Sequence, residues 1–334
     1  MSARALLLLV LGSAPAIAAA AEPPAAEPAP LAAHGLLLAL ARAGERLVAV
    51  GDHGIIVYSD DGGRRWTQAA AVPTQALLTG VCFFDAQHGI AVGHDLVALI
   101  SADAGATWQR THYEPQAARP LLDVWCGEGR RAIAVGAYST FLVSADGGAS
   151  WQERAFRPAQ RPRAARAGEH GSDNSDNGFH LNRIVGSAVR LYIAAEAGHL
   201  YRSDDGGEQW HELASPYEGS FFGAVPLTGA VVLAYGLRGN LFRSADGGDS
   251  WQRLASGTVA MLDGGVRLGG DGAALVGLAG VLLLSRDGGR TFTLVQQADH
   301  SGLAAVQALD ESTLVAVGEN GARRIELTGR AGTP

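Results

Sequence analysis

The sequence contains no lysine, and all 26 of its basic residues are arginine. Enzymes that form a Schiff base through a lysine amine are therefore excluded. Arginine-rich coding bias is the simplest origin of this composition. The formal net charge of -7 also argues against a general nucleic-acid-binding protein, because such a protein usually carries a basic excess that contacts phosphates.

Cysteine is scarce too, since Cys82 and Cys126 are the only two residues of this type. Two cysteines are too few for the disulfide framework of a small secreted domain. They lie one position apart in register in neighbouring repeats, so alternating strand geometry directs them to opposite blade faces, where they can meet. The sequence is compatible both with a Cys82–Cys126 bridge and with two buried free thiols.

The N-terminal apolar run is too short to span a bilayer. It covers 5–11, follows the single charge of Arg4 and precedes small residues that end at Ala21. This layout is typical of a cleavable secretory signal, here residues 1–21. Because no cysteine follows it to take a lipid, we expect a protein released into the periplasm or otherwise exported. Residues 22–32 are rich in proline and alanine and predict an extended linker.

Glycine, by contrast, is abundant, with 45 residues, and much of it falls in a repeated octet of the form Ser-x-Asp-x-Gly-x-x-aromatic. Six octets end at aromatic residues spaced by 42, 43, 59, 41 and 41 positions: Trp66, Trp108, Trp151, Trp210, Trp251 and Phe292. A second marker, an apolar segment ending in a small residue, occurs seven times, at Gly51, Gly93, Gly136, Ala195, Gly236, Gly277 and Gly318. This period predicts seven repeated units, with one insertion between repeats three and four.

Each repeat contains four segments with strand character. In the second repeat these are Thr79 to Phe84, Gly89 to Gly93, Leu96 to Ser101 and Thr107 to Thr111. Four short antiparallel strands per repeat are typical of a propeller blade. The predicted fold is therefore all-β, a seven-bladed β-propeller of four-stranded antiparallel blades over residues 33–327, followed by a tail at 328–334.

The seventh repeat is the exception. It has strand candidates at 303–309, 313–318 and 322–327 but no octet and no fourth segment. Either blade seven has three strands, or residues near Pro30 complete it.

The octet has a composition suited to a hairpin turn. Ser and Asp side chains bond to nearby backbone N–H groups, Gly supplies a positive φ, and the aromatic residue packs back on the blade. Calcium binding at Asp60–Asp61 or Asp204–Asp205 is disfavoured, because one octet lacks enough oxygen ligands. We assign a structural role to Asp61, Trp66, Asp103, Trp108, Asp146, Trp151, Asp205, Trp210, Asp246, Trp251, Asp287 and Phe292.

The octets SDDGGRRW, SADAGATW, SADGGASW, SDDGGEQW, SADGGDSW and SRDGGRTF resemble Asp-box (BNR) repeats. With seven repeats, each carrying its strand-Gly marker, the chain is most similar over about 33–327 to the photosystem II stability/assembly factor family and its bacterial relatives. The resemblance implies Asp-box hairpins on a propeller that docks membrane-protein subunits through an arginine-rich patch. Sialidases, other glycoside hydrolases and sortilin-type receptors carry Asp boxes too.

Successive turns of a blade lie on opposite rims, so the turns between strands two and three share the rim opposite the octets. The polar residues of these turns predict a partner-binding ring: Asp52, His53, His94, Asp95, Tyr138, Glu196, Arg238 and Glu319. The alternative is that these polar turns are simply solvated. A metal held by Asp52, His53, His94 and Asp95 lacks supporting ligand spacing, so no metal is predicted.

The insertion, residues 156–178, joins blade three to blade four and is expected on the same rim. Arginines in and beside it form a second predicted partner-binding group: Arg154, Arg157, Arg161, Arg163 and Arg166. Such a cluster suits carboxylate-rich protein surfaces or, in peripheral membrane contact, phospholipid headgroups. The polar tract 172–178 resembles part of a calcium loop, but Ile184 occupies the place of its closing glutamate. A mobile linker is the alternative for the whole insertion.

We predict an exported, non-enzymatic scaffold that binds membrane or envelope protein subunits as an assembly or stability factor. It is expected to be a monomer without cofactor or nucleic-acid partner. The first alternative is a sialidase-like glycoside hydrolase, but the Arg-Ile-Pro motif is absent, and no motif singles out Glu196 with Asp95 or Glu319 as its pair of catalytic carboxyls. The second alternative is a carbohydrate- or peptide-binding receptor.

Overall fold

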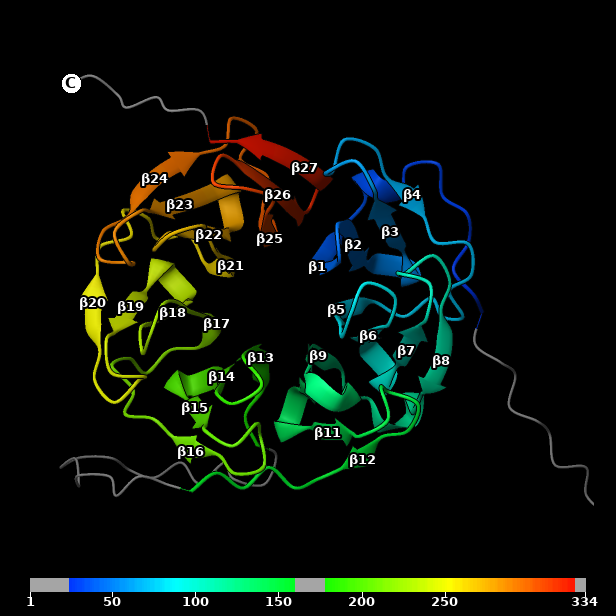
Figure 1. Cartoon of the computed structure of the whole chain (residues 1–334), viewed down its shortest axis with the longest axis horizontal. Coiled ribbons are helices and arrows are strands. Elements are labelled where there is room, and N and C mark those ends of the chain that lie inside the picture. Colours follow the sequence, from blue (N-terminus) through cyan, green and yellow to red (C-terminus); the bar gives the residue numbers. More distant parts are fainter. Residues whose placement is uncertain (1–23, 160–177, 328–334) are drawn as a thin grey trace, which may run out of the picture.

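The computed structural model describes residues 24–159 and 178–327. In this part of the chain, seven β-sheets surround a central axis (Figure 1), and each sheet forms one blade of a propeller. The predicted signal sequence, most of the insertion and the predicted tail lie outside the described residues. No helix in the described ranges is long and apolar enough to cross a membrane.

The strands of each blade follow one another from the axis outward. Blade 1 comprises β1 (Leu37–Ala43), β2 (Arg46–Gly51), β3 (Ile56–Ser59) and β4 (Thr67–Gln68), and blade 2 comprises β5 (Leu78–Phe83), β6 (Gly89–Gly93), β7 (Ala98–Ser101) and β8 (Gln109–His112). Blade 3 comprises β9 (Leu121–Cys126), β10 (Ala132–Gly136), β11 (Phe141–Ser144) and β12 (Gln152–Glu153), and blade 4 comprises β13 (Leu181–Gly186), β14 (Leu191–Ala195), β15 (Leu200–Ser203) and β16 (His211–Glu212). Blade 5 comprises β17 (Phe221–Pro226), β18 (Val232–Gly236), β19 (Leu241–Ser244) and β20 (Gln252–Leu254), and blade 6 comprises β21 (Leu262–Arg267), β22 (Ala273–Gly277), β23 (Val281–Ser285) and β24 (Thr293–Gln296). Blade 7 comprises β25 (Leu303–Ala308), β26 (Thr313–Gly318) and β27 (Gly321–Glu326).

The second strand of each blade forms the centre of the core. β6, β10, β14, β18 and β22 are buried at every residue. Each lies between two strands of its own sheet and is covered on both faces by neighbouring blades. A strand covered on both faces has no polar side to alternate with, so its sequence is continuously apolar.

The predicted seven-bladed fold is confirmed, and the strand bounds differ only at their ends. In blade 2 the third strand begins at Ala98 rather than Leu96, because residues His94–Leu96 form a 3-10 turn. The outer strand begins at Gln109, after the octet turn has ended.

Blade 7 has three strands in the described part of the chain, which answers the question of its closure. The segment near Pro30 adds no strand to this blade. Instead, the Ala26 N–H donates to the Val72 carbonyl, and the Ala29 N–H donates to the side chain of Gln68 in β4. This segment therefore lies along the outer side of blade 1.

Each octet closes the hairpin between the third and the outer strand of its blade. In blade 4 the Gly207 N–H donates to the Ser203 hydroxyl at 2.8 Å, and the Ser203 hydroxyl donates to Asp205. The Asp205 carboxylate also accepts the N–H groups of Glu208 and Gln209. The same glycine-to-serine bond is present in all six octets. We call the rim that carries these turns the octet rim.

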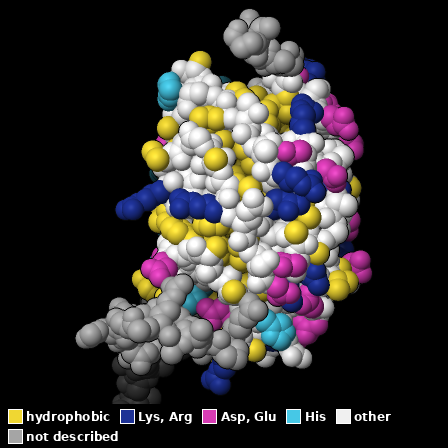
Figure 2. Space-filling model, turned by 90° about the vertical axis from the view of Figure 1, so that its left-hand side faces the viewer, with side chains coloured by type: hydrophobic (Ala, Val, Ile, Leu, Met, Phe, Trp, Pro, Cys, Tyr) yellow, Lys and Arg dark blue, Asp and Glu magenta, His cyan; other side chains and the backbone are white. Residues whose placement is uncertain are grey.

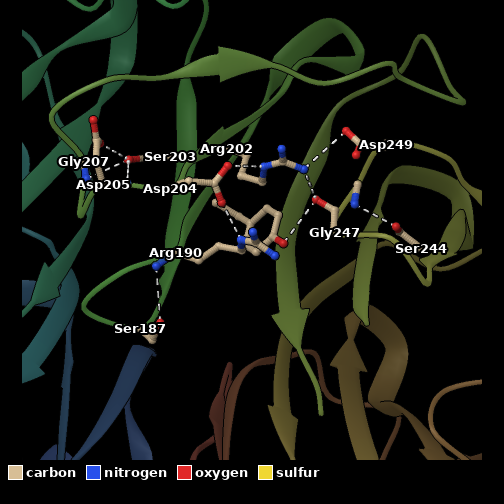
Figure 3. A network of polar contacts seen from close by, with 12 residues as sticks. Ser187, Arg190, Arg202, Ser203, Asp204, Asp205, Gly207, Ser244, Gly247 and Asp249 are labelled. Carbon is tan, nitrogen blue, oxygen red and sulfur yellow. Dashed lines mark hydrogen bonds and ion pairs between the residues drawn. The ribbon is translucent and has the colours of Figure 1, made fainter. Parts of the chain in front are cut away.

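Arginine side chains connect the octets of neighbouring blades on this rim. Figure 3 shows Arg202 of β15 donating to the Gly247 carbonyl of the next octet at 2.9 Å, while Asp204 bonds both Arg190 and Arg202. The acceptor is the fourth residue of the octet. The same octet position accepts an arginine from the preceding blade at three more junctions: Arg46 to Ala104, Arg243 to Gly288 and Arg324 to Gly62. The last of these ties blade 7 to blade 1.

The two cysteines form a disulfide between β5 and β9, with their Cα atoms 5.7 Å apart. Of the two alternatives that the sequence left open, the bridge is the one present. It covalently joins the inner strands of blades 2 and 3.

Candidate functional site

The turns between second and third strands lie on the rim opposite the octets, which we call the turn rim. In six blades the turn is a short 3-10 element: η2 (Asp52–Gly54), η3 (His94–Leu96), η6 (Ala137–Ser139), η7 (Glu196–Gly198), η8 (Leu237–Gly239) and η9 (Leu278–Gly280). The middle residue of each turn has a positive φ, in order His53, Asp95, Tyr138, Ala197, Arg238 and Ala279. A left-handed conformation at a non-glycine residue costs roughly 1–2 kcal/mol, which the packed turn must supply.

These turns are held in place by contacts with the connector that leads to the next blade. In η2 the Gly54 N–H donates to the Ala76 carbonyl in the connector to blade 2. A Cβ atom at Gly54 would lie 2.1 Å from the Thr74 carbonyl oxygen, so only glycine fits there. The preceding His53 side chain remains 79% exposed. The turn therefore presents the side chain of its left-handed residue to solvent.

Several predicted ring residues are engaged in local contacts. Asp52 pairs with the neighbouring His53 at 2.9 Å. Glu196 accepts the backbone N–H of His180 at 3.0 Å and lies 3.3 Å from that residue's ring nitrogen. Glu319 accepts the Gly302 N–H at 2.9 Å. The two glutamates thus fix the segments that follow blades 3 and 6, whereas His94 and Arg238 are exposed.

No group of three or more metal-binding side chains is present within residues 24–159 and 178–327. Asp52 and His53 belong to blade 1, whereas His94 and Asp95 belong to blade 2. Two of the octet acids considered for calcium are engaged by arginine: Asp60 accepts two hydrogen bonds from Arg46, and Asp204 pairs with Arg190 and Arg202.

Exposed apolar side chains gather on the turn rim, a feature that the sequence analysis missed. Tyr138 is 48% exposed, and Val259 in the connector after blade 5 is 86% exposed. Leu36, Phe179 and Leu278 are also exposed on this rim. Only Tyr138 was predicted, because an apolar residue in a connector carries no signal that distinguishes a surface position from a buried one.

Aromatic rings connect this rim to the side of the propeller at the junction of blades 3 and 4. Tyr138 contacts His180 edge to face at 5.0 Å between centroids, and Phe179 lies 4.0 Å from the His199 ring. His199 in turn stacks on Tyr201 of β15, which contacts Phe156 at 5.0 Å. We call these rings the aromatic ladder.

The first residues of the insertion, 156–159, lie at the outer end of this ladder. Phe156 packs against Phe141 and Trp210, and Ala159 pairs with His211 beside β16. A pocket of about 320 Å³ opens here and is lined by the same aromatic rings together with Arg154 and Arg157.

The structure separates Arg154 from the predicted ring. Its guanidinium lies 3.3 Å from Glu208, which belongs to the octet of blade 4. Arg157 is exposed on the outer side of the same junction. Directly after the insertion the chain lies at the turn rim, where the Ser139 N–H donates to the Phe179 carbonyl. Arg161, Arg163 and Arg166 lie outside the described residues.

Charged side chains are unevenly distributed over the side of the propeller. Figure 2, which views the side formed by blades 5 and 6, shows acidic side chains mostly along one edge and arginine and apolar side chains across the middle. In these blades the octet rim carries Asp246, Asp249 and Asp287 together with Arg286 and Arg290.

No family model matches the sequence, and no curated protein matches it. Solved propeller structures do match it. YCF48 bound to a D1 peptide has a TM-score of 0.68 and 17% identity, with 92% of this chain and 99% of that chain covered. YCF48 from Cyanidioschyzon merolae has a TM-score of 0.67 and 14% identity, with 90% and 98% covered.

An enzyme shares the architecture as well. The GH74 xyloglucanase from Xanthomonas campestris has a TM-score of 0.62 and 14% identity, with 90% of this chain and 53% of that chain covered. At such identities the likeness establishes the propeller fold alone. Function has to be argued from the site, because one fold hosts both binding proteins and hydrolases.

Proposed function

We propose that this protein is an exported, non-enzymatic scaffold that binds protein partners through its turn rim, as an assembly or stability factor for a membrane-protein complex. One observation carries the proposal. Exposed apolar residues, among them Tyr138 and Phe179, share the turn rim with His94 and Arg238. Aromatic residues and arginine are the types that dominate the energetics of protein interfaces.

The local geometry suits an extended peptide. Tyr138 and Phe179 are held by edge or face contacts to His180 and His199, so they lose little conformational freedom on binding. YCF48, which has the same fold, was solved with a peptide bound. A peptide strand that crosses the junction of blades 3 and 4 would place its apolar side chains on these rings.

The arginines extend the proposed surface around the outer side of this junction. Arg157 is exposed beside the pocket that Phe156 and Trp210 line, so an acidic residue of the partner can pair with it bidentately. Phospholipid headgroups are the alternative ligand of these arginines.

Partner capture from envelope extracts tests the proposal. We expect Phe179→Ser and Arg238→Glu to reduce recovery of a membrane-protein partner. Val189→Ser is the matched control, because Val189 is 66% exposed but lies in the turn between β13 and β14 on the octet rim. Equal recovery with all three variants would rule out the turn rim as the binding surface.

A second comparison addresses the arginines. Arg157→Glu and a variant with Arg161, Arg163 and Arg166 changed to Glu are expected to weaken capture, and vesicles with anionic lipids distinguish a headgroup from a protein carboxylate. Turnover of a glycan that is abolished by Glu196→Gln would instead support the hydrolase alternative.

A further inference from the structure

The inner strands share a structural irregularity near the axis. In every blade the pairing of the inner with the second strand shifts after the first residue of the inner strand. The first residue after this shift is, from blade 1 to blade 7, Ala39, Gly80, Asp123, Arg183, Gly223, Gly264 and Ala305. Five of these positions are small. The two charged ones are adjacent, in blades 3 and 4.

A cavity of about 190 Å³ lies on the axis at this level and is lined by residues of all seven inner strands. Its polar wall consists of Asp123, Arg183, Gln307 and the Tyr235 side chain. Asp263, beside Gly264, is close enough for its charge to act on Arg183. These residues come from five different blades, so no local sequence pattern brings them together.

Tyr235 reaches the cavity from the second strand of blade 5 because two glycines leave room for it. A Cβ atom at Gly223 would lie 2.3 Å from the Tyr235 hydroxyl oxygen, and one at Gly265 would lie 3.0 Å from it. Either side chain would displace the phenol, so the hydroxyl depends on glycine in both neighbouring inner strands.

Arg183 retains unused hydrogen-bonding capacity. Its Nε donates to the Phe222 carbonyl at 3.2 Å, which ties blade 4 to blade 5. Neither Nη atom takes part in a hydrogen bond or ion pair within the described parts of the chain. Protein surrounds the guanidinium, yet part of its surface faces the axial cavity. Two donors thus point to a space that an acceptor can occupy.

The two aspartates have unused capacity as well. Asp123 accepts the Ile184 N–H at 3.0 Å and a backbone hydrogen bond from Val124, and no side chain within the described residues donates a hydrogen bond to it. The Asp263 side chain makes no hydrogen bond within residues 24–159 and 178–327. Burial raises the pKa of both carboxyls, and the charge of Arg183 partly opposes this effect.

The combination of groups selects the ligand chemistry. A simple anion on Arg183 would be repelled by Asp123 and Asp263, and a simple cation beside the aspartates would be repelled by Arg183. A molecule that carries both charges satisfies both sides. An apolar cavity of about 150 Å³ holds benzene, so this site is large enough for a small α-amino acid.

We propose that the axial cavity binds a small zwitterion of the α-amino acid type. Its carboxylate accepts from the Nη atoms of Arg183 and from Tyr235, and its ammonium group donates to Asp123, while the nearby charge of Asp263 adds to the negative side of the site. The lining residues of the inner strands are the third to fifth of each strand, so the site lies on the axis between the two rims.

Calorimetric titration of the full chain with glycine and alanine tests this proposal, with acetate and methylammonium at equal ionic strength as single-charge probes. We expect saturable binding of the zwitterions and none of the single-charge probes. Arg183→Met and Asp123→Asn should each weaken binding at least about tenfold, since each removes a charged partner that lines the cavity. Tyr235→Phe should weaken it by about twofold to tenfold.

Thr79→Val is the matched control, because it removes a hydrogen bond from β5 to the Leu121 carbonyl of the next blade without lining the cavity. It should bind like the unmodified protein. Circular dichroism confirms that each variant is folded. The proposal is overturned if no zwitterion binds, if acetate binds as tightly as glycine, or if folded Arg183→Met and Asp123→Asn retain full affinity.

Discussion

The Arg202 guanidinium donates to the carbonyl oxygen of Gly247 at 2.9 Å, across the junction between blades 4 and 5. Gly247 is the fourth residue of its octet, and the same octet position accepts an arginine at three other junctions. The octet is therefore more than a local turn. The carbonyl of its fourth residue accepts a hydrogen bond from an arginine of the preceding blade and so connects the two blades.

Replacement of Arg202 by methionine should destabilise the propeller by about 1–2 kcal/mol, because a hydrogen bond from a charged, mostly buried group is lost. Urea unfolding followed by fluorescence measures this change. Arg286→Met is the control, since Arg286 occupies the exposed second position of the octet in blade 6. A destabilisation of equal size in both variants would show that the inter-blade bond contributes nothing specific.

The disulfide gives a second stability prediction. Cys82 and Cys126 are separated by 44 positions, and a cross-link that closes a loop of this length restricts the unfolded chain. We expect the Cys82→Ser, Cys126→Ser double variant to lose about 2–4 kcal/mol of unfolding free energy. Reductant should lower the stability of the unmodified protein towards that of the variant. If reductant lowers the stability of the double variant equally, the effect does not come from the bridge.

The spacing of the octets and of the strand-Gly markers was sufficient to predict the fold. A periodic turn motif fixes where each hairpin closes, so the number of blades follows from counting. The cysteine pairing did not follow, because it depends on a Cα separation that neighbouring blades determine. The sequence also left the closure of blade 7 undecided, because the position of the segment near Pro30 depends on contacts with residues far away in the chain.

The candidate site was predictable only where it lies in a turn. Tyr138 and Arg238 follow a marker residue and therefore stand out, whereas Phe179 lies in a connector. Arg154 was grouped with nearby arginines by composition, but its carboxylate partner Glu208 is 54 positions away. Arg183 escaped notice because a register shift in the inner strand breaks the alternation by which an axial residue is recognised.

Acid should destabilise the octet rim before it affects the core. Backbone hydrogen bonds from Arg65 lower the pKa of Asp61 to about 2, and hydrogen bonds from Ser150 lower the pKa of Asp146 to about 2. An unfolded aspartate has a pKa of about 3.9, so these carboxylates stabilise the fold above that pH. This contribution is lost as the pH falls from about 5 to about 2.

Thermal melts from pH 6 to pH 2 measure this loss. Asp146→Asn should lower the melting temperature at pH 6 and flatten its decline below pH 5, because one of the titrating groups is gone. Glu311→Gln, at an exposed position in the loop before β26, should leave the profile unchanged. Parallel declines in the unmodified protein and in Asp146→Asn would contradict an octet origin of the acid sensitivity.

Within the aromatic ladder, we expect Phe156 to contribute mainly to stability and Phe179 mainly to partner binding. Phe156 contacts three rings and is half-buried, whereas Phe179 contacts one ring and is 41% exposed. Phe156→Ala should therefore cost about 2–3 kcal/mol of unfolding free energy, below the range for a fully buried phenylalanine. Phe179→Ala should cost about 1 kcal/mol or less.

Partner capture should show the reverse order, with a larger loss of binding for Phe179→Ala at a temperature where both variants are folded. Limited proteolysis gives an independent check, because Phe156 anchors the chain where the insertion begins. Cleavage after Ala159 should accelerate in Phe156→Ala and remain unchanged in Phe179→Ala. If Phe156→Ala is as stable as the unmodified protein, the ladder does not fix the insertion, and Arg157 loses the support that positions it beside the pocket.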